Sequence, residues 1–264
     1  MEEYLELDPT VRIEENIDHN VLTNFSKFDR LISPTYIKKA PFRNFLIALS
    51  RSDGKLYNIL KRAHLNEHTG KAIISELLEL DIIKIYESRE EPLKKYPKQK
   101  IKKALRGYKI QPIIRFAYPF YNFWFGFIEP FRSEIILGKY ERFFEYFQKH
   151  SIRATSLIFE QLANDFIAME FDTLSSGNYW DKHGEFDILA LTKKDELILG
   201  ECKFKNKKIC KSELSKLEYK AQLSHIIPDI WVLFSKNGFS NKLKSSKMDN
   251  LKLYDLNNFK QFLH

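Results

Sequence analysis

Cysteine, glycine and long apolar runs are scarce in this chain, and each scarcity excludes a class of protein. The 264 residues include two cysteines, Cys202 and Cys210, which cannot form a disulfide framework and whose spacing fits no zinc ribbon. The most apolar stretch, residues 116–128, is shorter than the roughly 20 residues of a membrane span and is interrupted by proline, asparagine and glycine. We therefore expect reduced thiols and no membrane-spanning segment.

The N-terminal stretch MEEYLELDPT is acidic and lacks the apolar segment of a signal peptide, so we expect a cytoplasmic protein. With 22 Phe and 13 Tyr against 9 Gly, the composition argues against disorder, and the length allows two globular parts. The formal net charge of +8 favours polyanionic partners such as nucleic acid, although charge alone does not prove binding.

Residues 41–115 show the element order of a winged helix-turn-helix domain. The segments FRNFLIALS, LYNILKRA and TGKAIISELLELDII carry apolar residues at three- and four-residue steps, which predicts three short helices. A strand, IIKIYES, follows, and a lysine-rich tract returns as a second strand near Tyr108. The third helix, at about 68–80, would be the recognition element and the hairpin would be the wing.

Lysines of the wing and of the third helix are candidate contacts to nucleic acid. Their density suits a phosphate backbone, whereas the alternative is a solvated loop. The third helix offers no arginine for reading guanine, so we expect duplex DNA to be bound with weak sequence specificity. The candidate residues are Lys71, Lys98, Lys100, Lys102 and Lys103.

One motif in this region is misleading. His64 to His68 matches H-x-x-E-H, a zinc-protease pattern that needs both histidines on one face of an unbroken helix. The surrounding pattern predicts a turn at residues 65–67. We therefore reject a zinc site here.

The remaining chain predicts an α/β domain with a mixed sheet flanked by helices. Residues 1–40 are assigned as an N-terminal remnant or extension, 116–150 as an aromatic-rich helical connector, and 151–264 as the α/β domain. In the last of these, the amphipathic segment SLIFEQLANDFIAMEF predicts a helix. The strands EFDILAL, LILGECKF, DIWVLFS and LKLYDL follow, with a helix between the second and third.

Charged residues occupy strands that otherwise look half buried. Asp187 and Glu201 can lie side by side across the predicted hairpin, and Lys203 leaves the strand from the same face as Glu201. Two carboxylates, with the backbone carbonyl of Cys202, suit Mg²⁺ or Mn²⁺, and Glu160 on the preceding helix could complete an acidic shell. The plain alternative is a salt bridge at a sheet edge.

The order of these motifs resembles a known superfamily. A helix with Glu160, then GNYW, GEFDILAL and ILGECKF, is similar to the PD-(D/E)xK nucleases, which have a restriction-endonuclease-like fold. More narrowly, the aromatic block YKIQPIIRFAYPFYNFWFGFIEP followed by this core resembles the domain behind a winged helix in archaeal-type P-loop ATPases. The resemblance implies metal ligation by Asp187 and Glu201, a catalytic role for Lys203 and an accessory role for Glu160.

No G-x-x-x-x-G-K-[ST] loop is present, so the ATPase domain of those longer relatives is missing. The expected function is a Mg²⁺- or Mn²⁺-dependent nuclease that hydrolyses DNA phosphodiester bonds. Two alternatives stay open: a catalytically inactive nuclease-fold module that binds DNA or a partner ATPase, and an RNA-directed defence or toxin component. The sequence makes no prediction of oligomeric state.

Overall fold

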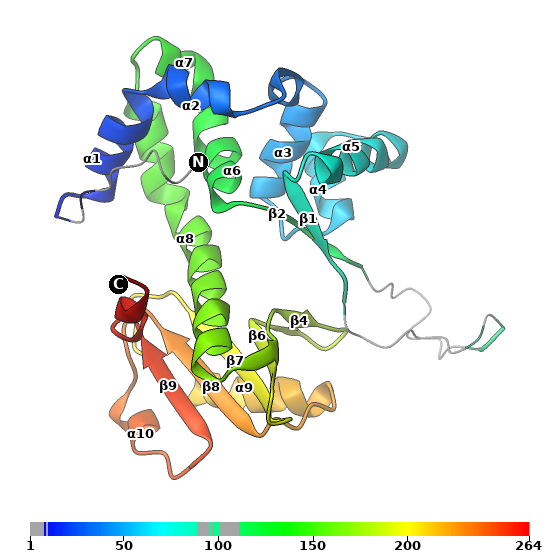
Figure 1. The fold of residues 1–264 in the computed structure, drawn as a ribbon, viewed down its shortest axis with the longest axis vertical. Coiled ribbons are helices and arrows are strands. Elements are labelled where there is room, and N and C mark those ends of the chain that lie inside the picture. Colours follow the sequence, from blue (N-terminus) through cyan, green and yellow to red (C-terminus); the bar gives the residue numbers. More distant parts are fainter. Residues whose placement is uncertain (1–7, 9, 89–95, 97, 101–110, 264) are drawn as a thin grey trace. The chain divides into compact units, whose positions relative to one another are not determined.

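The chain divides into two compact units. The computed structural model describes residues 8, 10–88, 96, 98–100 and 111–263 (Figure 1). The first unit comprises Met1–Glu87 and Gln111–Ser151, and the second comprises Ser88–Ile110 and Ile152–His264.

The first unit begins with short helices that the sequence did not predict. They are the α-helices α1 (Ile13–Ile17) and α2 (Phe25–Leu31), the π-helix η2 (Asp18–Leu22) and the 3₁₀-helix η3 (Thr35–Lys38). Most of their apolar side chains are buried, with Phe28 only 1% exposed, whereas Ile13 is 54% exposed. The described helices between residues 13 and 38 therefore contribute side chains to the core of the first unit.

Three helices and a two-stranded sheet follow. The helices expected from the apolar spacing are present as α3 (Phe42–Ser50), α4 (Leu56–Ala63) and α5 (Glu67–Glu79). Strand β1 (Ile83–Tyr86) pairs antiparallel with β2 (Ile113–Phe116). The returning strand predicted near Tyr108 lies outside the described residues.

The zinc-protease pattern is broken, as predicted. His64 ends α4 in the left-handed conformation, with φ 54°, and α5 begins at Glu67. The side chain of Asn66 caps α5 by accepting a hydrogen bond from the N–H of Thr69 at 2.8 Å. His64 and His68 therefore do not share a helix.

The aromatic block forms the interior of the first unit. Its elements are the α-helices α6 (Pro119–Phe123) and α7 (Arg132–Ile136), with the π-helix η5 (Trp124–Ile128) and the 3₁₀-helix η6 (Glu129–Phe131) between them. Trp124 is fully buried and stacks on Phe25 with ring centroids 5.6 Å apart. The buried carboxylate of Glu129 accepts a hydrogen bond from Arg43 at 2.9 Å, so its charge is paired. Among the described residues, no helix has the length and apolarity needed to cross a membrane.

Helix α8 (Glu141–Glu170) runs from the first unit into the second, and the boundary falls between Ser151 and Ile152. The second unit holds a five-stranded sheet in the order β3–β6–β7–β8–β9. Its strands are β3 (Thr173–Ser175), β6 (Ile188–Thr192), β7 (Leu197–Lys203), β8 (Ile230–Ser235) and β9 (Leu251–Asp255). The β3–β6 and β6–β7 pairs are antiparallel, and β7–β8 and β8–β9 are parallel. The predicted mixed sheet is therefore confirmed.

Helices cover both faces of this sheet. On one face, α8 packs through Phe159 and Phe166 against Ile198 and other strand residues, together with the closing turn η7 (Asn258–Leu263). On the other, α9 (Lys211–Leu223) and α10 (Asn241–Lys244) pack against alternate residues of the same strands, including Leu199. Because side chains alternate along a strand, Glu201 and Lys203 share the α9 face with Leu199.

Candidate active site

The two central antiparallel strands separate at Asp187. Pairing between β6 and β7 ends with Ile188 opposite Gly200. Beyond that pair, a carboxylate oxygen of Asp187, Oδ2, accepts a hydrogen bond from the backbone N–H of Cys202 at 2.7 Å. The backbone carbonyl of Asp187 accepts another from the side chain of Asn164 on α8 at 2.9 Å. Asp187 is therefore held from two directions at the point where the strands part.

The backbone of Cys202 faces Asp187. The carbonyl of Lys203 accepts a hydrogen bond from the N–H of Lys236, which follows β8, at 3.1 Å. Since backbone groups of successive residues point to opposite sides of a strand, those of Cys202 point toward β6. Its N–H reaches Asp187, and its carbonyl oxygen faces the same side. The predicted carbonyl ligand is thus on the side where Asp187 lies.

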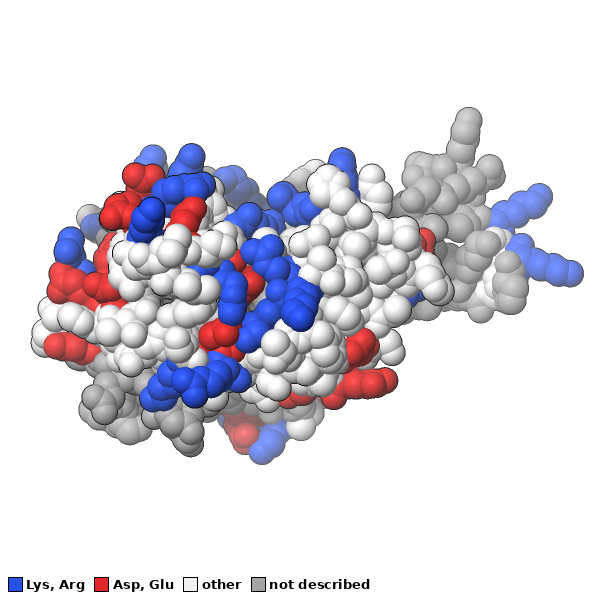
Figure 2. Space-filling view, turned by 90° about the horizontal axis from the view of Figure 1, so that it is seen from above, with Lys and Arg blue, Asp and Glu red and all other residues white. Residues whose placement is uncertain are grey.

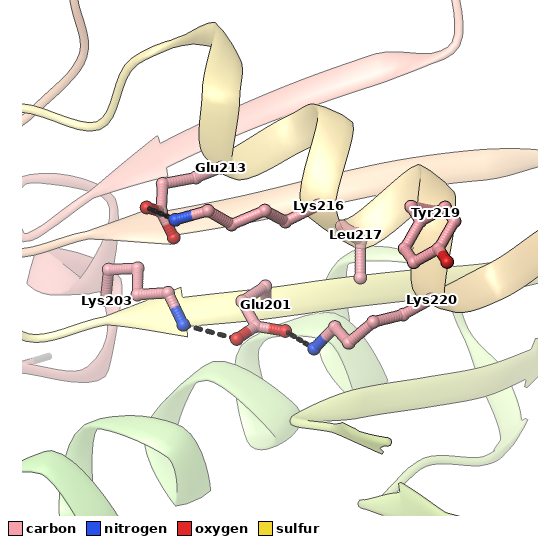
Figure 3. Close-up of a pocket in the computed structure, with 7 residues that line it drawn as sticks. All are labelled: Glu201, Lys203, Glu213, Lys216, Leu217, Tyr219 and Lys220. Atoms are coloured by element: carbon pink, nitrogen blue, oxygen red, sulfur yellow. Dashed lines mark hydrogen bonds and ion pairs between the residues drawn. The ribbon is translucent and has the colours of Figure 1, made fainter. Parts of the chain in front are cut away.

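Glu201 lies between two lysines on the α9 face. Its Oε1 contacts the ammonium of Lys203, and its Oε2 lies 2.6 Å from Nζ of Lys220 on α9 (Figure 3). The side chain of Glu201 is 13% exposed, and those of the two lysines are 20% and 25% exposed. Because these side chains are mostly shielded from solvent, their charges are screened less than those of ion pairs on the surface, and the contacts are stronger.

Sequence reasoning missed Lys220. Its ammonium also donates to the backbone carbonyl of Glu185 at 2.7 Å and lies 5.1 Å from the ring centroid of Phe186. Together with the ion pair to Glu201, three contacts therefore fix this lysine beside the predicted acid. The only signal in the sequence is the spacing of Lys216 and Lys220, which puts two cations on one face of a helix.

The charges of this cluster act on one another. Burial, and then repulsion by Glu201, raises the pKa of Asp187 from 3.8 to about 7, although the Cys202 N–H, Lys203 and Lys220 partly offset this. Desolvation disfavours the charged form of Lys203, but the attraction and hydrogen bond to Glu201, with the charges of Asp187 and Glu213, together outweigh it and raise the pKa of the lysine. The lysine is therefore cationic at neutral pH, whereas Asp187 is balanced between its two protonation states.

Glu160 lies on α8, which covers the face of the sheet opposite α9. On that helix it lies between core residues that pack on the thiol of Cys202. Burial, followed by the charges of Asp187 and Glu160, raises the pKa of that thiol well above its ordinary value. The acid is thus within electrostatic reach of Cys202, but it does not share the α9 face with Glu201.

The groups that could hold a metal ion here are oxygen ligands, the kind that Mg²⁺ and Mn²⁺ prefer. Within the described residues, no three or more His, Cys, Asp or Glu side chains gather closely enough to hold a metal. Mg²⁺ is commonly held by one or two carboxylates and completes its shell with waters and substrate phosphates. Asp187, Glu201 and the Cys202 carbonyl are the groups that could contribute to such a shell. Because burial and then the charge of Glu201 raise the pKa of Asp187, a cation added nearby would favour its ionised form.

The lysines proposed to contact nucleic acid are only partly described. Lys71 on α5 forms an ion pair with Glu67 at 2.7 Å. Lys98 and Lys100 are exposed, whereas Lys102 and Lys103 lie outside the described residues. On the face shown in Figure 2, basic and acidic side chains are intermingled, so the net charge does not form one uninterrupted basic surface there.

Comparison with known proteins adds one match. A family described as "DUF234: Archaea bacterial proteins of unknown function" matches residues 124–217. That segment, less than half of the chain, contains Asp187, Glu201 and Lys203 and ends three positions before Lys220. Neither the curated proteins nor the solved structures include a match.

Proposed function

We propose that this protein is a divalent-metal-dependent nuclease that hydrolyses DNA phosphodiester bonds. The observation that carries the proposal is that the Glu201–Lys203 ion pair acts electrostatically on Asp187 at the point where β6 and β7 separate. Phosphodiester hydrolysis needs positive charge beside the phosphoryl oxygens and an activated water. A raised pKa on Asp187 and a charged Lys203 are typical of groups tuned for such chemistry.

Each residue has a separate role in this proposal. Asp187, Glu201 and the Cys202 carbonyl would hold Mg²⁺ or Mn²⁺, which supplies Lewis-acid stabilisation when bound. Lys203 orients the attacking water and stabilises the charge that grows on the phosphoryl oxygens. Asn164 and the Cys202 N–H keep Asp187 in position.

We further propose that the second unit has the restriction-endonuclease-like fold and the first contains a winged helix-turn-helix. The mixed sheet with α8 and α9 on opposite faces supports the former. The order α3, α4, α5, β1, β2 supports the latter. In this interpretation the wing lysines contact duplex DNA through its phosphates.

One observation favours a second candidate, a catalytically inactive module that binds DNA or a partner ATPase. Both oxygens of Glu201 already contact ammonium groups, so a metal ion must compete with Lys203 and Lys220 for that carboxylate. If Glu201 binds the two ammonium groups more tightly than the metal ion, the cluster is a structural ion pair. RNA has the same phosphodiester linkage, so the cleavage assay includes it as a substrate.

The decisive experiment is cleavage of plasmid, linear duplex, single-stranded DNA and RNA with Mg²⁺ or Mn²⁺. The parent protein should cut at least one DNA substrate, and Asp187→Ala should not. Asp195→Asn, at an exposed position in the β6–β7 turn, is the matched acidic control and should cut like the parent. A parent protein that cuts nothing refutes the nuclease, and selective cutting of RNA corrects the substrate.

A further inference from the structure

The pocket between β7 and α9 contains side chains that the proposed hydrolysis does not use. Its volume is about 340 Å³. A pocket of roughly 300 to 1,000 Å³ is of the size that holds a small ligand, such as one nucleotide of a strand. Besides Glu201, Lys203 and Lys220, it is lined by Glu213, Lys216, Leu217 and Tyr219 (Figure 3).

Tyr219 is the aromatic side chain of this pocket. It projects from α9 beside Lys220 and is 61% exposed, whereas Leu217, two residues earlier, is fully buried (Figure 3). The hydrophobic effect would favour covering so large a ring, and the fold leaves it in water. An exposed aromatic face next to cations is the arrangement that single-stranded nucleic acid proteins use to stack bases.

Several lysines lie in the segment between the end of β7 and the start of α9, the two elements that line the pocket. The segment that joins β7 to α9 is short and exposed except at Phe204 and the buried Ile209. On α9, Lys216 pairs with Glu213 at 2.8 Å. That hydrogen bond, together with the nearby charges of Lys203 and Lys205, lowers the pKa of Glu213. Exposed lysines of this joining segment and of the start of α9 are Lys205, Lys207, Lys208 and Lys211.

We propose that this pocket, the Tyr219 pocket, binds one nucleotide of a single-stranded nucleic acid, with its base stacked on Tyr219. Phosphates next to that nucleotide contact lysines between positions 205 and 216. The inference rests on the proposed nuclease function and specifies its substrate: the strand is unpaired where it enters the site.

The reason for a single strand is the geometry of stacking. In a duplex the faces of each base are covered by its neighbours, so a protein ring reaches a base face only after the base has left the stack. Stacking on an aromatic ring tolerates any base, since every base has a π-face. The pocket therefore selects for strand state and not for sequence.

The test measures binding without cleavage. Fluorescence anisotropy in EDTA compares a labelled single-stranded 12-mer, as DNA and as RNA, with the matching DNA duplex. Tyr219→Ala should raise the Kd for the single strand by roughly 5- to 100-fold, the loss expected for one stacked base. Tyr219→Phe, which keeps the ring, should bind like the parent. Tyr57→Ala removes a tyrosine of similar exposure, 66%, from α4 and should have no effect on single-strand affinity.

The lysine contribution has its own control within the same unit. Replacing Lys207 and Lys208 by Gln should lower the slope of log K against log salt by about 1.4, or 0.7 for each lost contact to a single strand. Lys193 and Lys194 lie in the turn before β7, at the opposite end of that strand, and their replacement should leave the slope unchanged.

Failure of this inference can be told apart from failure of the nuclease. The pocket proposal is overturned if the parent does not bind single strands, or if Tyr219→Ala binds them with parental affinity. In either case cleavage that depends on Asp187 still supports the nuclease. Conversely, loss of single-strand binding in Tyr219→Ala, with no cleavage by the parent, leaves a binding pocket in an inactive module. The DNA and RNA arms decide which strand it prefers.

Discussion

Lys220 Nζ lies 2.6 Å from Oε2 of Glu201, on the carboxylate whose other oxygen contacts Lys203. One acid is therefore shared by a lysine from its own strand and a lysine from α9. Because Lys220 also lowers the pKa of Asp187, it couples the two acids of the candidate site. This coupling leads to the first prediction.

Lys220→Gln should move the pH midpoint of cleavage to higher pH. Loss of the ammonium leaves Asp187 with less positive charge nearby, so its pKa rises further and its ionised form appears at higher pH. The measurement is a pH–rate profile. Lys216→Gln removes a cation one turn earlier on α9, where the partner is Glu213, and should leave the midpoint unchanged. Equal midpoints in both variants would contradict the coupling.

Asp187→Ala and Lys203→Ala should fail in different ways. Lys203→Ala should lower the cleavage rate by about 10²- to 10³-fold, as loss of a transition-state donor does, but keep metal affinity. Glu201 still has Lys220 in that variant, and one competitor of the ion is gone. Asp187→Ala should lose both cleavage and metal affinity. Calorimetric titration with Mn²⁺ beside the cleavage assay separates the cases, and parental metal binding by both variants would make the acids structural.

The raised pKa of Asp187 predicts that the folded state loses stability as pH rises. Between 3.8 and about 7 the folded protein keeps a proton that the unfolded chain has released, so the contribution is complete below pH 3.8 and lost by pH 7. Asp187→Asn cannot ionise and should show a shallower decline in unfolding free energy across that window. Urea unfolding at pH 5 and pH 8 measures the difference. The exposed Asp195→Asn should keep the parental slope, and an unchanged slope in Asp187→Asn would argue against a raised pKa.

Gly200 is required by the close approach of β7 and β8. A Cβ at this position would lie 2.2 Å from Cγ2 and 3.0 Å from the backbone oxygen of Val232. Gly200→Ala should therefore destabilise the protein by about 1 to 3 kcal/mol, the usual cost of overpacking. At Gly126 the nearest atoms would be 3.5 Å away, on Ser50, so Gly126→Ala should cost far less. Denaturant unfolding of both variants tests this, and equal stabilities would show that β8 yields easily.

The wing lysines predict a salt effect on duplex binding. Replacing Lys98, Lys100, Lys102 and Lys103 by Gln should weaken binding at low salt and reduce the log–log slope by about 0.9 for each lost phosphate contact. Lys98 and Lys100 are exposed and available for such contacts. The matched control replaces Lys193 and Lys194 in the β6–β7 turn. An unchanged slope in the wing variant would mean a solvated loop.

Local patterns in the sequence were sufficient for helices α3, α4, α5 and α9 and for strands β6 to β9. The apolar stripe with Phe159 and Phe166 predicted a helix in α8, and alternation around a charged turn predicted the β6–β7 hairpin. These signals are local because helix and strand periodicities repeat within a few residues. The hairpin alone also places Asp187 opposite the end of β7, near Glu201, so that part of the candidate site was readable. The short helices of residues 13–38 have no such clear period and were not predicted.

Tertiary structure decided the environment of those residues. Lys220 reaches Glu201 because β7 and β8 are parallel, and the crossover between parallel strands carries α9 back over the sheet. The ladder between β6 and β7 ends at the pair Ile188–Gly200, so the residue before Ile188 is not paired with β7 in the ladder. The carboxylate of Asp187 instead accepts the hydrogen bond of the Cys202 N–H. Sequence spacing describes neighbours along the chain, whereas a shared carboxylate or a raised pKa depends on groups brought together by packing. The sequence by itself determined which charged residues are available, and only the fold decided that two lysines share one acid.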